Sequence, residues 1–273
     1  MSTAIDRRAP TGLRRIYEQN ERLIIGVGSV IAFLIIWEAA FRFSWVNPTF
    51  ISGPSQVFLA AIKTFKSADF HTDIQTSALE FIIGYLMSIG IGVPLGLATG
   101  SSKRISYLVS PFVHILNIVP RITLLPVIII WFGIGIWSKV LVVFLGALIP
   151  ILISTYGGVK TSEERFMKVA RSFNASPSRT FITIVLPGTV PFIFTGIKYG
   201  TGRALLGVIV GELYAATAGI GYFIAAAGNS LETDKMLVGV GVVIAVGLIA
   251  LEVLNRVEKR FDRWRPVVES EKS

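Results

Sequence analysis

Apolar residues occur in six long and nearly continuous runs, separated by shorter polar segments. Each run reaches or approaches the ~20 residues that a helix needs to cross about 30 Å of hydrocarbon. Because the runs do not alternate between apolar and polar positions, they favour helices over the strands of a barrel. We therefore predict an all-α integral membrane protein. Its expected membrane-spanning helices cover residues 23–43, 78–99, 107–131, 140–158, 187–210 and 236–254.

The polar segments divide the chain into an N-terminal segment (1–22), a membrane domain (23–258) and a tail (259–273). Lysine and arginine are distributed unevenly. The segments 1–22, 100–107 and 159–186, together with the residues after 254, hold 18 of them, and the opposite set of loops holds four. Positively charged loops stay in the cytoplasm. We therefore expect a multi-pass protein of the cell (inner) membrane, with both termini and the 159–186 segment in the cytoplasm.

The 273 residues are 52% hydrophobic and 16% charged. Soluble domains average about 25% charged residues, so much of this surface is expected to face lipid. The net charge of +9 lies mainly in the loops and indicates orientation in the membrane rather than nucleic-acid binding. The absence of cysteine excludes disulfides, thiolate metal sites and a cysteine nucleophile. No G-x-x-x-x-G-K-[ST] phosphate loop is present, so we do not expect this chain to hydrolyse ATP.

Glycines spaced four residues apart recur within the expected spans. Such spacing lets two helix backbones approach closely, which predicts a tightly packed bundle. The pairs are Gly92 and Gly96, Gly196 and Gly200, and Gly207 and Gly211.

The segment 159–186 is a polar, basic interruption between two apolar runs, and it is longer than a simple turn requires. Thr161 can cap a helix, and Glu164 stands at the position that completes a capping box. The helix is expected to continue through Ala170. Asn174 is placed to end it, because asparagine tolerates the left-handed conformation common at helix C-termini.

A second helix is expected directly afterwards. Ser176 can serve as its cap, and Pro177 fits the first helical position. The segment then reaches Leu186 and Pro187 at the start of the next apolar run. The pattern predicts a helix–turn–helix that docks on a cytoplasmic partner.

This segment resembles the coupling loop of ABC importer permeases, whose pattern is Glu-Ala-Ala, three residues, Gly, nine residues, Ile, one residue, Leu-Pro. The spacing is intact, although a lysine replaces the acidic residue and an asparagine replaces the glycine. The residues at the matching, ATPase-coupling positions are Lys168, Val169, Ala170, Asn174, Ile184, Leu186 and Pro187.

The resemblance extends beyond this loop. The stretches 117–126 and 131–139, the Gly-Glu at 211–212 and the Gly-Ile-Gly-Tyr at 219–222 look like the nitrate/sulfonate/taurine-type permeases. The likeness implies a type I importer permease bundle that forms a dimer, here a homodimer. It also implies a cytoplasmic ATPase that binds the ATP and Mg²⁺, and an external solute-binding protein. The implied substrate is a small oxyanion or sulfonate such as nitrate, taurine or an alkanesulfonate.

Polar residues at membrane depth are candidates for the translocation path. Arg121 lies near the middle of the third apolar run, between two prolines that break the helix. It could attract an anionic solute, or it could pair with a carboxylate. Lys198 and Arg203 lie in the fifth run, where we expect structural pairing. The full set of path candidates is Asn117, Pro120, Arg121, Thr123 and Glu212.

Three alternatives remain open. Relatives of the same family carry vitamin precursors or aromatic acids, so the substrate could belong to those classes. An ion-coupled secondary transporter is a second possibility, although the chain shows no internal repeat and has a docking loop that such a mechanism does not need. A membrane enzyme is a third, although no nucleophile–base pair or metal-ligand cluster supports it.

Overall fold

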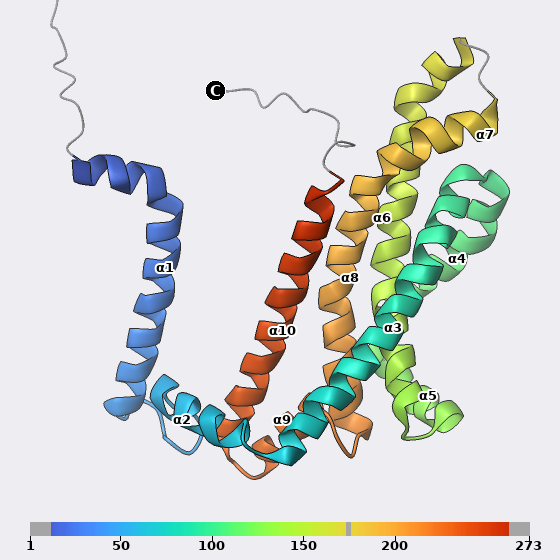
Figure 1. The fold of residues 1–273 in the computed structure, drawn as a ribbon. Coiled ribbons are helices and arrows are strands. Elements are labelled where there is room, and N and C mark those ends of the chain that lie inside the picture. Colours follow the sequence, from blue (N-terminus) through green and yellow to red (C-terminus); the bar gives the residue numbers. More distant parts are fainter. Residues whose placement is uncertain (1–11, 173–175, 262–273) are drawn as a thin grey trace, which may run out of the picture.

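The computed structural model describes residues 12–172 and 176–261, and all regular structure within these ranges is helical (Figure 1). This agrees with the predicted fold class. The elements are α1 (Gly12–Arg42), α2 (Pro54–Thr64), α3 (Ala68–Ser101), α4 (Lys103–Ile118), η1 (Arg121–Leu124), α5 (Leu125–Phe132), α6 (Ile136–Ser172), α7 (Pro177–Thr180), η2 (Phe181–Val185), α8 (Leu186–Ala215), α9 (Ile220–Asn229) and α10 (Thr233–Lys259).

Five helical segments in the described residues are long and apolar enough to cross a membrane. They correspond to five of the six predicted spans. The second begins about ten residues earlier than predicted, because α3 starts at Ala68 in a polar stretch that continues the helix without a break. The segments cover Asn20–Arg42, Ala68–Ser101, Ile136–Ser162, Ser178–Tyr214 and Thr233–Lys259.

The remaining predicted span, 107–131, is not one straight helix. Its residues form α4 and α5, which are joined by η1 and bent by 94°. Val119 is extended, with φ −66° and ψ 122°, because the ring of the following proline disfavours the helical conformation. Counting the bent pair as one span gives up to six crossings in the described part of the chain. The break is at Pro120, as the sequence suggests.

Helix α6 forms the centre of the bundle, packed between α3 and α8. Glycines on α3 allow the closest approach: Gly92, Gly96 and Gly100 face Ile151, Thr155 and Val159 in turn. A Cβ atom at Gly96 would lie 2.7 Å from the Cβ of Thr155, which is too close for two side chains. On α8, Gly196, Gly200 and Gly207 meet α6 in the same way. The predicted tight packing at these glycine pairs is confirmed.

Helix α1 stands apart from the other membrane helices (Figure 1), and its main packing partner is α2. The contact is made where Glu38 accepts hydrogen bonds from the backbone N–H and the hydroxyl of Ser55, at 3.0 and 2.8 Å. Arg42 forms an ion pair with the same carboxylate at 2.6 Å. The apolar side chains of α1 from Leu23 to Ile36 are exposed, so a second surface or lipid must cover them.

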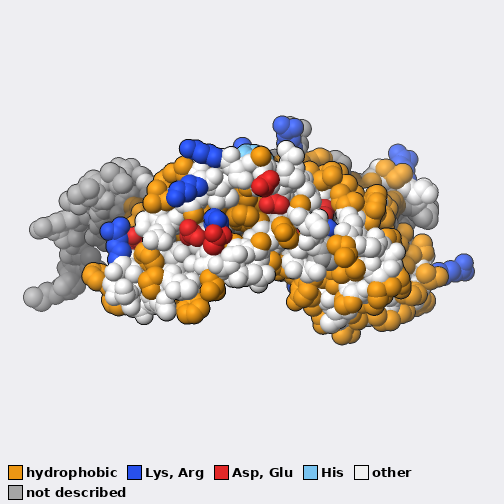
Figure 2. Space-filling view, turned by 90° about the horizontal axis from the view of Figure 1, so that it is seen from below, with side chains coloured by type: hydrophobic (Ala, Val, Ile, Leu, Met, Phe, Trp, Pro, Cys, Tyr) orange, Lys and Arg blue, Asp and Glu red, His pale blue; other side chains and the backbone are white. Residues whose placement is uncertain are grey.

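The segments rich in lysine and arginine lie at one end of the molecule. The first turns of α1, the α3–α4 junction, the α6–α7 segment and the end of α10 are together at the top of Figure 1. Helices α2, α5 and α9 lie at the other end. Figure 2 shows that other end, where acidic and basic side chains lie together on the surface. The chain thus brings its basic segments to a single side.

Candidate functional site

The expected coupling segment begins as an extension of α6. The prediction of a new helix starting at Thr161 is wrong, because α6 runs unbroken from Ile136 to Ser172. The Thr161 hydroxyl donates to the carbonyl of Gly157 at 2.9 Å, within the helix, rather than capping it. Residues 159–172 contain neither glycine nor proline, so nothing interrupts the backbone hydrogen bonds. A helix therefore connects the membrane directly to the predicted docking residues.

Those residues occupy the last turns of α6. Lys168, Val169 and Ala170 are helical, and Asn174 lies outside the described residues. The described structure resumes at Ser176, whose hydroxyl oxygen accepts a hydrogen bond of 3.4 Å from the backbone N–H of Arg179. Helix α7 begins at Pro177, so the predicted helix start is confirmed.

The return into α8 passes through a wider helical turn. Ile184 lies in η2, a π-helix, and the N–H of Leu186 donates to the carbonyl of Phe181, five residues back. Pro187, in the first turn of α8, has no N–H to donate. A π-turn is a common accommodation for an interrupted helix ladder. The Ile-x-Leu-Pro pattern thus forms one continuous helical path rather than a turn followed by a separate helix.

The end of this segment is packed firmly against α6. Val185 and Thr189 are buried, and a Cβ atom at Gly188 would lie 2.7 Å from the hydroxyl of Ser162. One turn further along, Gly158 admits the ring of Phe192. In contrast, Ile182 in η2 is 62% exposed. The exposed apolar side chain of Ile182 therefore lies next to a segment that is firmly packed on α6, and a partner protein can contact it.

The second part of the site is a hollow of about 360 Å³, here called the central hollow. It lies between the α4–α5 break, α6 and α8. Among the described residues that line it, two have polar side chains, Asn117 and Arg203, and none is acidic. The residues that form it are Asn117, Ile118, Val119, Pro120, Ile122, Val142, Gly146, Arg203, Leu206, Gly207 and Val210.

The structure brings two of the five path candidates, Asn117 and Pro120, into the central hollow. Arg121 begins η1 next to them, and its side chain is outside the described part of the structure. Thr123 does not line the hollow. Its hydroxyl donates to the carbonyl of Pro120 at 2.6 Å and so stabilises the tight turn.

Glu212, the fifth path candidate, lies elsewhere. It is buried near the α9 end of α8, where it accepts hydrogen bonds from the Ser77 hydroxyl at 2.5 Å and the Gly221 N–H at 2.6 Å. Asp73 accepts from the Gly219 N–H at 2.7 Å. Three side chains of α3 and α8 thus hold the start of α9 in place, since Ser77 also accepts from the next N–H of that turn. This is a structural arrangement of the kind that buried carboxylates require.

Two further charges belong to the same region. Lys139 on α6 and Glu80 on α3 are both buried, with the Lys139 Nζ 3.6 Å from a carboxylate oxygen of Glu80. Neither carboxylate oxygen of Glu80 has a hydrogen-bond partner among the described residues. Its carboxyl group is also a neighbour of that of Glu212. We call Glu80, Lys139 and Glu212, with Ser77, the outer cluster.

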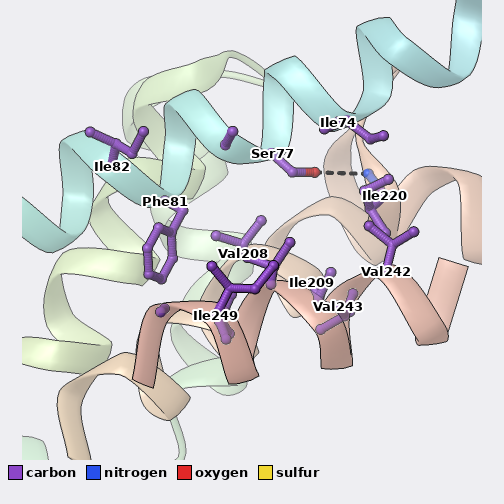
Figure 3. A pocket seen from close by; sticks show the side chains of 14 residues that line it. Ile74, Ser77, Phe81, Ile82, Val208, Ile209, Ile220, Val242, Val243 and Ile249 are labelled. Atoms are coloured by element: carbon purple, nitrogen blue, oxygen red, sulfur yellow. Dashed lines mark hydrogen bonds between the residues drawn. The ribbon is translucent and has the colours of Figure 1, made fainter. Parts of the chain in front are cut away.

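An apolar pocket of about 300 Å³ lies between α3, α8, α9 and α10 (Figure 3). Its labelled side chains are aliphatic or aromatic apart from Ser77, which accepts a hydrogen bond from the Ile220 N–H. A polar solute needs convergent polar groups to fix its orientation. This pocket lacks them, so it does not suit a charged solute.

Structural pairing was expected for both basic residues of the fifth apolar run, Lys198 and Arg203, and the structure shows it for Lys198. Lys198 forms a partly buried ion pair with Glu258 of α10. Arg203, five residues further along α8, has an exposed side chain and no hydrogen bond or ion pair with any described residue. The sequence analysis did not place Arg203 in the path. Its position in the middle of an apolar run was the only available signal.

The fold and the site define a multi-span helical membrane protein with a firmly packed helical segment at one end and, among its helices, a hollow lined by Asn117, Arg203 and apolar residues. A family model described as "Binding-protein-dependent transport system inner membrane component" matches residues 92–263. The chain belongs to this family, and it is accordingly an ABC permease with a transport role in the membrane.

The chain is similar to several curated permeases. It is 28% identical over 255 residues to the taurine transport system permease protein TauC of Escherichia coli, covering 92% of this chain and 93% of TauC. It is 28% identical to the putative aliphatic sulfonates transport permease protein SsuC of Bacillus subtilis, covering 85% and 84% of the two chains. It is 30% identical to the Escherichia coli protein of the same description, with 86% and 90% covered.

Proposed function

We propose that this chain is the membrane-spanning subunit of an ATP-driven importer of small sulfonates or related oxyanions. In this proposal a homodimer of the chain forms the translocation path. An external binding protein delivers the solute, and a cytoplasmic ATPase binds the ATP and Mg²⁺. Both termini and the coupling segment face the cytoplasm, because the basic segments gather at that end.

The observation that carries the proposal is the geometry of the coupling segment. Helix α6 extends from the centre of the bundle to the Lys168–Ala170 turn, and the return path at Leu186 and Pro187 is packed against α6. A push on this segment would therefore move α6 and α8 together, and both helices line the central hollow. Movement of an ATPase could in this way reach the solute path without a flexible link.

Two observations support the substrate class. Relatives that cover most of the chain are described as taurine or aliphatic sulfonate permeases. The described residues that line the central hollow include an arginine and an amide but no acid, which suits a small anion.

Capture of the ATPase tests the proposal. The tagged chain should co-purify with an ABC ATPase in mild detergent, and an Ala170→Glu substitution should reduce the captured amount by at least about tenfold, since one buried contact is worth 1–3 kcal/mol. The matched control is Ala226→Glu, which adds the same charge at an exposed position of α9, at the other end of the molecule. It should leave capture unchanged. Equal capture by both variants, or no ATPase with the unaltered chain, would contradict the proposal and favour an ion-coupled mechanism.

A further inference from the structure

Arg203 lies in the middle part of α8, one of the helices that are long and apolar enough to span a membrane. It is 12 residues from the last residue of α8, which corresponds to about 18 Å along the helix axis. Half of the hydrocarbon thickness is about 15 Å. A charged side chain at this depth is costly on an isolated helix, so it is normally paired or placed in a wet cavity.

Pairing does not account for Arg203. No acidic residue is among the described residues that line the central hollow, and the buried acids of α8 and α10 have other partners. Glu258 pairs with Lys198, and Glu212 accepts hydrogen bonds in the outer cluster. Arg203 thus lines the hollow, is exposed, and donates no hydrogen bond to any described protein group.

The rest of the hollow suits a small anion. Asn117 supplies an amide that can donate hydrogen bonds, and the remaining lining is apolar or glycine. Gly146 and Gly207 line the hollow where α6 and α8 pack closely, since a Cβ atom at Gly207 would lie 3.1 Å from the Cα of Val143. A volume of about 360 Å³ holds a solute with a few carbon atoms. The planar guanidinium can donate two parallel N–H bonds to two oxygens of one sulfonate or similar group.

We propose that Arg203 is the principal anion-binding residue of the translocation path, and that Asn117 assists it in holding the sulfonate or oxyanion group of the solute. The substrate class rests on the proposed function. The electrostatic part of the proposal does not rest on the proposed function, because it requires only that Arg203 makes the central hollow attractive to anions.

A thiol in the hollow measures this attraction directly. The chain has no cysteine, so an Asn117→Cys variant carries a single thiol. Membranes with the full chain are treated with 2-sulfonatoethyl methanethiosulfonate, which is a small anionic sulfonate, or with its cationic trimethylammonium analogue. The rate of labelling of this chain is read by intact mass. The labelling rate with the anionic reagent, divided by the labelling rate with the cationic reagent, reports the electrostatic potential at the thiol. Changes in the accessibility or reactivity of the thiol affect both rates equally and cancel in this ratio.

Adding Arg203→Gln should lower this ratio by about tenfold or more, because one nearby charge acts on the two reagents in opposite directions. Arg203→Lys retains the positive charge, so the ratio should stay close to that of the Asn117→Cys variant with Arg203 intact. The matched control is Arg256→Gln, which removes an exposed arginine paired with Glu252 at the end of α10 and should not change the ratio. An unchanged ratio in Arg203→Gln would overturn the proposal, and so would a ratio that falls only with Arg121→Gln. Neither result depends on ATPase capture, so failure here is distinct from failure of the proposed function.

Discussion

The outer cluster and the central hollow share two helices, α6 and α8, but differ in how their charged side chains are placed. Helix α6 contributes Lys139 to the cluster and Gly146 to the hollow, and α8 contributes Glu212 and Arg203. In the cluster, charged groups are buried against one another and bonded to the start of α9. In the hollow, the one charged side chain among the described lining residues is exposed and unpaired.

This difference separates structural charges from functional ones. A buried charge with partners stabilises its neighbours only while all of them are present, since removal of one leaves another uncompensated. A charge without partners contributes nothing of that kind to folding. Its retention at membrane depth requires another explanation, and solute binding supplies one. Substitutions in the cluster should therefore reduce stability, and substitutions at Arg203 should reduce transport.

The largest loss of stability is expected for Lys139→Met. The substitution leaves the Glu80 carboxylate, which has no hydrogen-bond partner among the described residues, without its cation. We expect the free energy of unfolding in detergent micelles to fall by about 3–5 kcal/mol. Lys235→Met removes an exposed lysine from an ion pair with Glu232 and should have little effect. A small loss in Lys139→Met would mean that the cluster is not a structural unit.

Gly219→Ala should have the next largest effect. Gly219 has φ +122°, which residues with a Cβ atom rarely adopt, and a Cβ would lie 2.3 Å from a carboxylate oxygen of Glu212. Strain and overlap together should cost about 3 kcal/mol. Faster hydrogen exchange at the amides of Ile220 and Gly221 would locate the damage at the start of α9. Gly202→Ala, beside Arg203, meets open space and should be neutral or slightly stabilising.

Lys198 and Arg203 provide a direct comparison on one helix. Lys198→Met should destabilise the protein by about 2 kcal/mol, because Glu258 loses a charged hydrogen-bond partner. Arg203→Met should change the free energy of unfolding by less than about 1 kcal/mol. Chemical unfolding of the two variants side by side measures the difference. Equal losses would show that Arg203 has a structural partner after all.

Local sequence signals predicted much of this fold. Proline at position 120 breaks the third apolar run, Ser176 and Pro177 start a helix, and the spaced glycines mark the contacts of α3 and α8 with α6. These features depend on backbone conformation or on the size of one side chain. Local propensity predicted a helix start at Thr161 that is wrong, because this good capping residue lies inside an uninterrupted helix.

Pairing over long distances could not be predicted from the sequence. Glu212 resembled a path residue because it is an acid at membrane depth, and its partner Ser77 is 135 residues away in the chain. Arg203 and Lys198 looked alike for the same reason. Only the packing of α10 beside α8 gives one of them a carboxylate and leaves the other exposed in the hollow.

The smallest effect is expected for Lys168→Glu in the coupling segment. The substitution restores the acidic residue that the resembled loop pattern has at this position. A single surface ion pair is worth up to about 1 kcal/mol, so stimulation of the ATPase by the binding protein should change by no more than about fivefold. ATP hydrolysis by the reconstituted complex measures the change. A complete loss of coupling would mean that Lys168 makes a specific contact with the ATPase.

Uptake of radiolabelled taurine tests the central claim most directly. The complex of this chain with its ATPase and binding protein is reconstituted in proteoliposomes, in parallel with a complex that carries Arg203→Gln. We predict ATP-dependent uptake by the unaltered complex. Uptake should be lower by about tenfold in the variant, whose subunits remain assembled and whose stability is retained. Equal ATP-dependent uptake by the two complexes would contradict the role assigned to Arg203, and uptake that needs an ion gradient but no ATP would contradict the importer itself.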